Sequence, residues 1–395
     1  MYRFNISAPG TVFLHGDTVL GYNGPCIAAA LDIRTKLQFS SLPPRVVPNE
    51  IIRIEFQNLE LHLDIPLEAF FEHFYDQNII RKFSCYELRN VIEMFIESLN
   101  INNSTYDPKN EEHKLFLQAF LYLLIRTAYE EEMEITASII VKLWTDLPTI
   151  KDLGTRTSFI VCLAACFWRW SLLQKGVVRY KFDSEDHTEI KLYAWNCEEM
   201  IYNSQSTINN FVSVYGTITV FEDENTAFTL DGMRPMKILM IDSNINQKME
   251  MNQTEEMKNL CPCVDSIMSS IAALSSISAE AINEIFEKSL IISKNETNWF
   301  RLLPLDSYKT VSAFINVNQG LLKGLGMSNG NIDIICTIVR KYSLGCKITG
   351  NGRYVFILLL PNSTDMVITK LKSELTYHNF RVVETTMSCD GIRVE

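Results

Sequence analysis

The chain lacks the features of membrane, secreted and nucleic-acid-binding proteins. We find no apolar stretch among its 395 residues that reaches the length of a membrane span. Met1–Asn5 enters an alternating, strand-like pattern directly, with no signal or transit peptide before it. A net charge of −11 argues against general binding to nucleic acid or to anionic membranes. We therefore expect a cytoplasmic protein that binds neither nucleic acid nor membrane.

Motifs of paired cysteines are also missing. The ten cysteines are scattered, mostly inside apolar runs such as those around Cys162, Cys166 and Cys336. Cys261 and Cys263 stand too close together for the usual zinc knuckle, and no second pair accompanies them. Buried, reduced thiols of a cytoplasmic protein explain this distribution better than a disulfide framework does.

Internal repeats and low-complexity tracts are absent as well, which leaves an ordinary globular chain. A length of 395 residues is long for one hydrophobic core and suits two domains. Hydrophobic residues make up 47% and charged residues 21%, a balance typical of a folded chain rather than a disordered one.

Hydrophobic periodicity predicts a mixture of strands and helices. We expect strands at Tyr2–Ala8, Thr11–Leu14, Ile33–Phe39, Ile51–Phe56, Ile135–Trp144, Lys175–Phe182, Val212–Phe221 and Lys237–Ser243. We expect helices at Pro66–Ile79, Cys85–Leu99, Glu111–Glu131, Ile190–Asn203, Cys263–Ser276, Ala279–Lys294 and Tyr308–Leu322. The turn-rich stretch Asp223–Pro235 is typical of a linker between domains.

Residues 146–165 have the layout of a phosphate-binding loop. After the strand-like run, the chain turns through Pro148 and Gly154 and enters an apolar helix. A strand, a glycine turn and a helix N-terminus direct free backbone N–H groups at one spot, which suits an anion. The loop is poor in glycine, however, and the same arrangement occurs without a ligand. The residues alone leave both an anion site and a structural turn open.

Three sequence blocks resemble the motifs of one kinase superfamily. SAPGTVFLHGD at 7–17 leads into GYNGPCIAAAL at 21–31. The middle block is DLPTIKDLGTRTSFIVCLAA at 146–165, and KITGNG stands at 347–352. In this order and at these separations they resemble the three motifs of the GHMP kinases, and within that superfamily the mevalonate kinases. The middle block aligns without a gap to the family pattern.

The resemblance spans essentially the whole chain, and Asn318-Gln319 also resembles the end of a family helix. It implies an α+β fold of two domains. Residues 1–225 would be like the second domain of ribosomal protein S5, and residues 226–395 like the ferredoxin-like GHMP C-terminal domain. It also implies ATP and Mg²⁺ as cofactors and mevalonate as substrate.

The resemblance places the ligand-binding residues in the three blocks. Those matching the nucleotide-binding positions are Leu153, Gly154, Thr155, Arg156, Thr157, Ser158, Gly350 and Gly352. On the substrate side lie His15, Asp17 and Thr18, of which the last two differ from the glutamate and histidine of the family. In the family, the residue matching His15 mostly supports the turn, so a packed histidine is an alternative to a functional one.

Two catalytic positions of the family are substituted. The lysine that assists the substrate hydroxyl is Thr11 here, which has neither its charge nor its reach. The catalytic aspartate is matched by Asn209, whose carboxamide does not take up a proton near neutral pH.

The metal-binding positions are altered as well. A serine that contacts magnesium in the family is Arg156 here, and a fixed guanidinium repels a divalent cation. The second metal ligand, a glutamate, is matched by Glu198. We expect either a solvated helix carboxylate at Glu198 or an ion pair in which the Arg156 guanidinium occupies the place of the metal.

Two hypotheses from different classes remain. The first is an ATP-dependent mevalonate kinase with impaired catalysis. The second is a non-catalytic relative that binds a nucleotide such as ATP or ADP, a metabolite or a protein partner. Thr11, Arg156 and Asn209 favour the second, whereas nearby residues such as Asp17 and Lys151 offer replacements that would favour the first. A homodimer is compatible with both.

Overall fold

The chain forms two compact units, each built from separate stretches of sequence. The computed structural model describes residues 1–17, 24–42, 50–74, 85–99, 104–148, 152–204, 207–223, 226–245, 263–293 and 304–395. The first unit contains Met1–Gly10, Ile33–Tyr215 and Gly391–Glu395. The second unit contains Thr11–Asp32 and Gly216–Asp390.

Two long strands, β1 (Tyr2–His15) and β2 (Cys26–Ser41), contribute to both units. In the first unit β2 pairs with β5 (Ile139–Thr145), which runs parallel to β3 (Ile51–Phe56), and β3 forms a hairpin with β4 (Leu61–Pro66). Buried and partly exposed residues alternate along β3 and β5, as expected for strands with one face in the core. β12 (Arg393–Val394) returns from the C-terminus to pair with β1.

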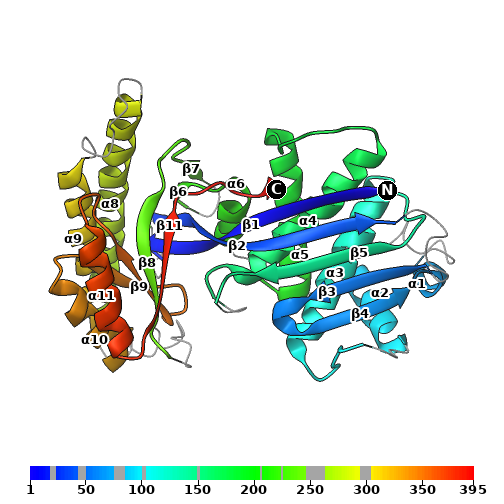
Figure 1. Cartoon of the computed structure of the whole chain (residues 1–395), viewed down its shortest axis with the longest axis horizontal. Helices are drawn as coiled ribbons and strands as arrows, with labels where there is room; N and C mark the ends of the chain where they lie inside the picture. Colours follow the sequence, from blue (N-terminus) through cyan, green and yellow to red (C-terminus); the bar gives the residue numbers. More distant parts are fainter. Residues whose placement is uncertain are drawn as a thin grey trace. The chain divides into compact units, whose positions relative to one another are not determined.

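Helices cover the buried face of the first unit's strands (Figure 1). They are α1 (Leu67–Phe74), α2 (Cys85–Ser98), α3 (Glu111–Glu130), α4 (Thr155–Gln174), α5 (Ser184–Tyr202) and α6 (Thr207–Tyr215). α3 and α4 are apolar on nearly every side and supply much of the core. A helix that is apolar all round belongs in the interior of a protein or in a membrane.

Helix α4 corrects one expectation from the sequence. By length and composition α4 could cross a membrane, although we found no stretch long enough. Polar residues such as Arg169 interrupt the apolar run in the sequence and obscure its length. In the structure 78% of the apolar window is buried inside the protein.

In the second unit, strands pair antiparallel in the order β2, β11, β8, β10, β9. The strands are β6 (Ile218–Phe221), β7 (Ala227–Thr229), β8 (Met236–Asp242), β9 (Gly345–Thr349), β10 (Tyr354–Leu358) and β11 (Arg381–Met387). The helices, on one side of β8 in Figure 1, are α8 (Val264–Ser293), α9 (Leu305–Gly324), α10 (Gly330–Arg340) and α11 (Asp365–Tyr377). Their apolar residues form a second core with β8, β9 and β10.

Four predicted elements are wrong, two of them strands and two of them helices. Lys175–Phe182 forms no strand, because the chain leaves α4 through Gly176 at φ 78° and continues as an exposed segment. Val212–Phe221 is divided between the end of α6 and β6. The two helices expected on either side of Ile277 are one helix, α8, in which the Ser275 and Ser276 hydroxyls donate hydrogen bonds to carbonyls of the preceding turn.

The mixed helix and strand content fits the α+β two-domain GHMP kinase fold. The division at residues 225 and 226 concerns the domains of the family and stays a prediction. By packing, the chain passes from the first unit to the second between Tyr215 and Gly216 and returns at Gly391. The linker expected at Asp223–Pro235 contains the short strand β7.

Candidate active site

The phosphate-loop-like turn is formed by backbone in an uncommon conformation. Leu153 and Gly154 are both left-handed, with φ of 55° and 68°, and Gly154 caps the N-terminus of α4. The Thr155 backbone N–H and hydroxyl both donate to the Asp152 carbonyl. Leu153, a non-glycine residue in the left-handed region, carries strain of about 1–3 kcal/mol.

Gly10, in the first sequence block, packs directly against this turn. A Cβ atom on Gly10 would lie 2.8 Å from the Leu153 carbonyl oxygen and 2.7 Å from Leu147 Cδ2. The strand β1 therefore lies against the loop so closely that only glycine fits.

Glu198 is a buried acidic residue near the end of α5. It is 3% exposed, and its Oε1 accepts a hydrogen bond of 2.5 Å from the Thr157 hydroxyl. Its Oε2 accepts one of 3.2 Å from the Asn210 amide. Burial raises the pKa of Glu198 to about 7, although these two bonds and the charge of Arg156 act in the opposite direction. Glu198 is thus a buried carboxyl with both oxygens engaged, and the expectation of a solvated carboxylate is wrong.

Arg156 does not form the ion pair that we expected with Glu198. Its guanidinium lies over the ring of Tyr202, 4.5 Å from the centroid, and its Nε is buried without a hydrogen-bond partner. The aromatic ring holds the cation, while Thr157 and Asn210 take the two carboxylate oxygens. Within the described residues no group of three or more His, Cys, Asp or Glu side chains is arranged to hold a metal.

Asn209 lies beside Asn210 on α6, partly exposed. Its Oδ1 is buried and has no hydrogen-bond partner in the described structure. The structure thus presents an unsatisfied amide oxygen at the position where the family has its catalytic aspartate. An amide oxygen accepts a hydrogen bond but not a proton near neutral pH.

In the second unit, His15 is a packed residue. It is fully buried, and its Nδ1 accepts a hydrogen bond of 2.8 Å from the Asn318 amide on α9. Burial, with a contribution from the charge of Lys347, lowers the pKa of His15 to about 3. His15 is therefore neutral at physiological pH and supports its turn rather than transferring protons.

A buried ion pair lies close to His15. Lys347 Nζ is 3.3 Å from Asp17 Oδ1 and 3.4 Å from the Phe13 carbonyl oxygen. From the same strand, Thr349 Oγ1 accepts a hydrogen bond of 2.8 Å from the Phe13 backbone N–H. Two alternate side chains of β9, Lys347 and Thr349, thus bind the end of β1 that belongs to the second unit.

The remaining positions of the first and third blocks show less specific contacts. Thr11 is 1% exposed, and its hydroxyl is buried without a hydrogen-bond partner. Gly350 and Gly352 adopt φ of 58° and 84° in the turn between β9 and β10. Arg353 continues this turn and forms a two-pronged ion pair with Asp242. Thr18 and Lys151 lie outside the described residues.

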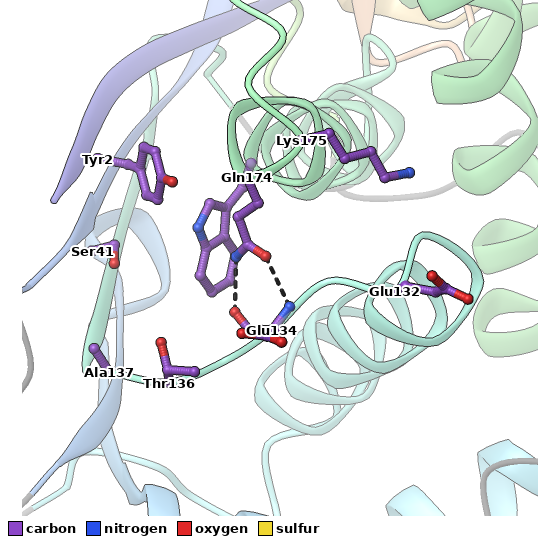
Figure 2. Close-up of a pocket in the computed structure, with 9 residues that line it drawn as sticks. Tyr2, Ser41, Glu132, Glu134, Thr136, Ala137, Gln174 and Lys175 are labelled. Carbon is purple, nitrogen blue, oxygen red and sulfur yellow. Dashed lines mark hydrogen bonds between the residues drawn. The ribbon is translucent and has the colours of Figure 1, made fainter.

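A separate pocket of about 440 Å³ lies at the other end of α4 (Figure 2). Gln174 and Glu134 join across it through two hydrogen bonds of 2.8 Å. Its lining residues are Tyr2, Ser41, Glu132, Glu134, Thr136, Ala137, Trp170, Gln174 and Lys175. At about 1.5 Å of rise per residue, Gln174 is roughly 28 Å along the helix from Thr155, so this pocket is unrelated to the phosphate-loop-like turn.

Sequence reasoning missed several residues of this region. The resemblance gives Thr157 only as a nucleotide-binding position, and it does not indicate Asn210 or Tyr202. Lys347 belongs to the quoted block KITGNG, so its motif offered a signal. The residues Tyr202 and Asn210 offered none, because their roles depend on how α4, α5 and α6 meet.

No family model matches the sequence. Curated relatives do match: the mevalonate kinase of Mus musculus is 24% identical over 399 residues, covering 98% of this chain and 94% of the relative. The fold is similar to that of Methanococcus jannaschii mevalonate kinase, with a TM-score of 0.66, 16% identity and 98% of each chain covered. It is also similar to L. major mevalonate kinase in complex with R-mevalonate, with a TM-score of 0.62, 14% identity and coverage of 99% of this chain and 97% of that one. By sequence this chain is similar to curated mevalonate kinases over nearly its whole length, and its fold is that of solved mevalonate kinases.

Proposed function

We propose that this chain binds ligands of the mevalonate kinase type but transfers the ATP γ-phosphoryl group to the mevalonate 5-hydroxyl very slowly or not at all. The observation that carries this proposal is the state of Glu198. In the family this position holds a metal, whereas here its two oxygens already accept hydrogen bonds from Thr157 and Asn210.

Mg²⁺ does not fit the residues present. This ion requires several oxygen ligands in near-octahedral geometry. The neighbouring position that supplies a hydroxyl in the family carries Arg156, whose guanidinium is stacked on Tyr202. Mg²⁺ at Glu198 would have to reach a carboxyl that is 3% exposed, already accepts two hydrogen bonds and lies near the fixed positive charge of Arg156.

The groups that act on the substrate hydroxyl are also changed. Phosphoryl transfer to an alcohol depends on positioning, on charge stabilisation and on a group that assists the hydroxyl. Asn209 cannot take up the hydroxyl proton, and the hydroxyl of Thr11 is buried and neutral. Loss of one acid–base group typically slows catalysis by about 10²–10⁴-fold. The loss of a cation and of a metal ligand would add to this.

Ligand binding is supported independently of these side chains. The turn at Leu153 and Gly154 leads into the N-terminus of α4, and helix N–H groups bind anions whatever the side chains are. The relative solved with R-mevalonate supports mevalonate as a second ligand. The second candidate function is accordingly a non-catalytic module that binds a nucleotide, a metabolite or a protein partner. The cytoplasmic location and a homodimer also remain proposals.

A coupled assay of ADP release with mevalonate tests the proposal. We expect no turnover above background from the natural chain. The combined substitution Thr11→Lys, Asn209→Asp and Arg156→Ser should restore measurable turnover. Because Thr11 is buried, the melting temperature of this variant must be measured to show that it folds.

The matched control keeps Thr11→Lys and Arg156→Ser but leaves Asn209 unchanged, so that only the proton acceptor is missing. Turnover by the natural chain at a rate ordinary for a metabolic kinase would contradict the proposal. If Lys151→Ala, or Asp17→Asn in a preparation whose melting temperature shows that it is folded, then abolished that turnover, the chain would be an enzyme with a rebuilt active site.

A further inference from the structure

Two cysteines of the second unit lie in direct contact. Cys336 is on α10 and Cys346 is on β9, and their sulfur atoms are 3.4 Å apart. Both thiols are free, and both side chains belong to the same apolar core. A disulfide places its sulfur atoms about 2.05 Å apart, so they need to approach by only about 1.4 Å.

The two thiols are not equivalent. Cys346 donates its S–H to the sulfur of Cys336, and this bond lowers the pKa of Cys336 against the effect of burial, with help from the charge of Arg340. The pKa of Cys346 is raised well above its usual range for the same reason, together with burial. Cys336 is also the more accessible of the two, at 5% exposure against 0%. It is therefore the thiol that forms a thiolate and meets an oxidant first.

We propose that Cys336 and Cys346 are a redox modification site that forms a reversible intramolecular disulfide with hydrogen peroxide as oxidant. The Cys336 thiolate attacks one peroxide oxygen, the O–O bond breaks, and the departing hydroxide takes up a proton to leave as water. Cys336 is now a sulfenic acid. The sulfur of Cys346 attacks the sulfur of Cys336, the S–O bond breaks, and a second water leaves with the Cys346 proton. In sum, two thiols and one peroxide give one disulfide and two waters.

The bond would join α10 covalently to β9. The residue after Cys346 is Lys347, whose ammonium holds Asp17 and the Phe13 carbonyl. Oxidation would therefore tie a helix to the strand that supports β1 in this unit. The proposal is independent of phosphoryl transfer and stands whether or not the chain is a kinase.

Peptide mapping of the full chain tests it directly. Trypsin cleaves after Lys323, Arg340, Lys341 and Lys347, so the two cysteines fall on separate peptides, 324–340 and 342–347. After treatment of the folded protein with hydrogen peroxide, blocking of free thiols and digestion, we expect these two peptides to be linked. Dithiothreitol should separate them again, and the link should be absent in Cys336→Ser and in Cys346→Ser.

Cys162 and Cys166 provide an internal control, because both are buried one turn apart on α4, and no hydrogen bond joins their sulfur atoms. They should remain as free thiols in the same digest. Failure of 324–340 and 342–347 to link, under peroxide that oxidises the exposed Cys263, would overturn the proposal. Equal oxidation of the Cys162 and Cys166 pair would also overturn it, since the contact would then confer no selectivity.

Discussion

Lys347 and Asp17 form an ion pair in which the lysine side chain is 0% exposed and the aspartate side chain 10% exposed. A buried ammonium without a partner is far more costly than a carboxylate that can reach water. The two residues therefore contribute unequally to the stability of the second unit.

This asymmetry gives the first prediction. Asp17→Asn should lower the free energy of unfolding by about 3–5 kcal/mol, because it leaves Lys347 buried and unpaired. Lys347→Met should cost less, and the double variant should be more stable than Asp17→Asn alone. Urea unfolding of the four proteins measures the coupling between the two side chains. Equal losses from the two single variants would show that the pair is not buried as described.

The second prediction concerns Glu198 and pH. Its pKa is raised from 4.5 to about 7 in the folded chain by burial, so the folded state binds the proton more tightly than the unfolded state does. The contribution of Glu198 to stability is therefore fully present below pH about 4.5 and is lost as the pH rises to about 7. The shift corresponds to about 3 kcal/mol.

Replacement of Glu198 by glutamine removes this titration. The Asn210 amide can turn its unpartnered Oδ1 toward the new NH₂ group, so the variant should pack well. We expect Glu198→Gln to unfold at a higher temperature than the natural chain at pH 8 and at nearly the same temperature at pH 4.5. Glu199→Gln serves as the control on the same helix. A difference between the variant and the natural chain that does not change with pH would contradict the shifted pKa.

The third prediction tests the close approach at Gly10. Gly10→Ala should be strongly destabilising, by about 2–3 kcal/mol, because the new Cβ meets the Leu153 carbonyl and the backbone must shift. Gly350→Ala is the matched control, since its Cβ would meet nothing within 4 Å and only the left-handed φ of 58° is penalised, at about 1 kcal/mol. Thermal unfolding should rank the two variants in this order.

The fourth prediction concerns nucleotide binding. Since Glu198 is engaged and Arg156 lies beside it, any rise in melting temperature caused by ATP should be the same with and without Mg²⁺. Arg156→Ser removes the guanidinium from the metal position, so the rise in melting temperature of this variant should depend on Mg²⁺. A strong dependence on Mg²⁺ in the natural chain would show that the metal binds through other residues.

Much of the fold was predictable because its signals are local. Periodicity placed β3, β8 and the helices α2 and α3, and motif order indicated the GHMP fold. It divided the continuous strand β1 in two and predicted only the second part of β2. The errors occurred where tertiary partners decide the outcome. Lys175–Phe182 was expected to be a strand but pairs with none of the strands in the described residues, and the serines in α8 resemble a break yet bond within the helix.

The candidate site was predictable only in part, for a similar reason. Alignment to the family identified Arg156 and Glu198. Arg156 lies in the first turn of α4, and Glu198 lies near the end of α5. The contacts that define them come from Thr157, which the middle motif gave only as a nucleotide-binding position, and from Asn210 and Tyr202, which no motif singled out. Whether a carboxylate pairs with an arginine or with a hydroxyl depends on distances of a few ångströms, which sequence spacing does not encode.

The sharing of β1 and β2 has a consequence for how the chain can fold. Neither unit is a continuous segment, since the first unit needs residues 391–395 and the second begins at Thr11. A nascent chain that has emerged only as far as Tyr215 lacks β12, the last strand of its own first unit. Pairings between residues nearly four hundred positions apart, such as Ser7 with Arg393, make native structure form slowly and late. A fragment that ends at Tyr215 and one that begins at Gly216 would each lack strands of their own unit, so we expect native structure to form more readily when the two fragments are expressed together.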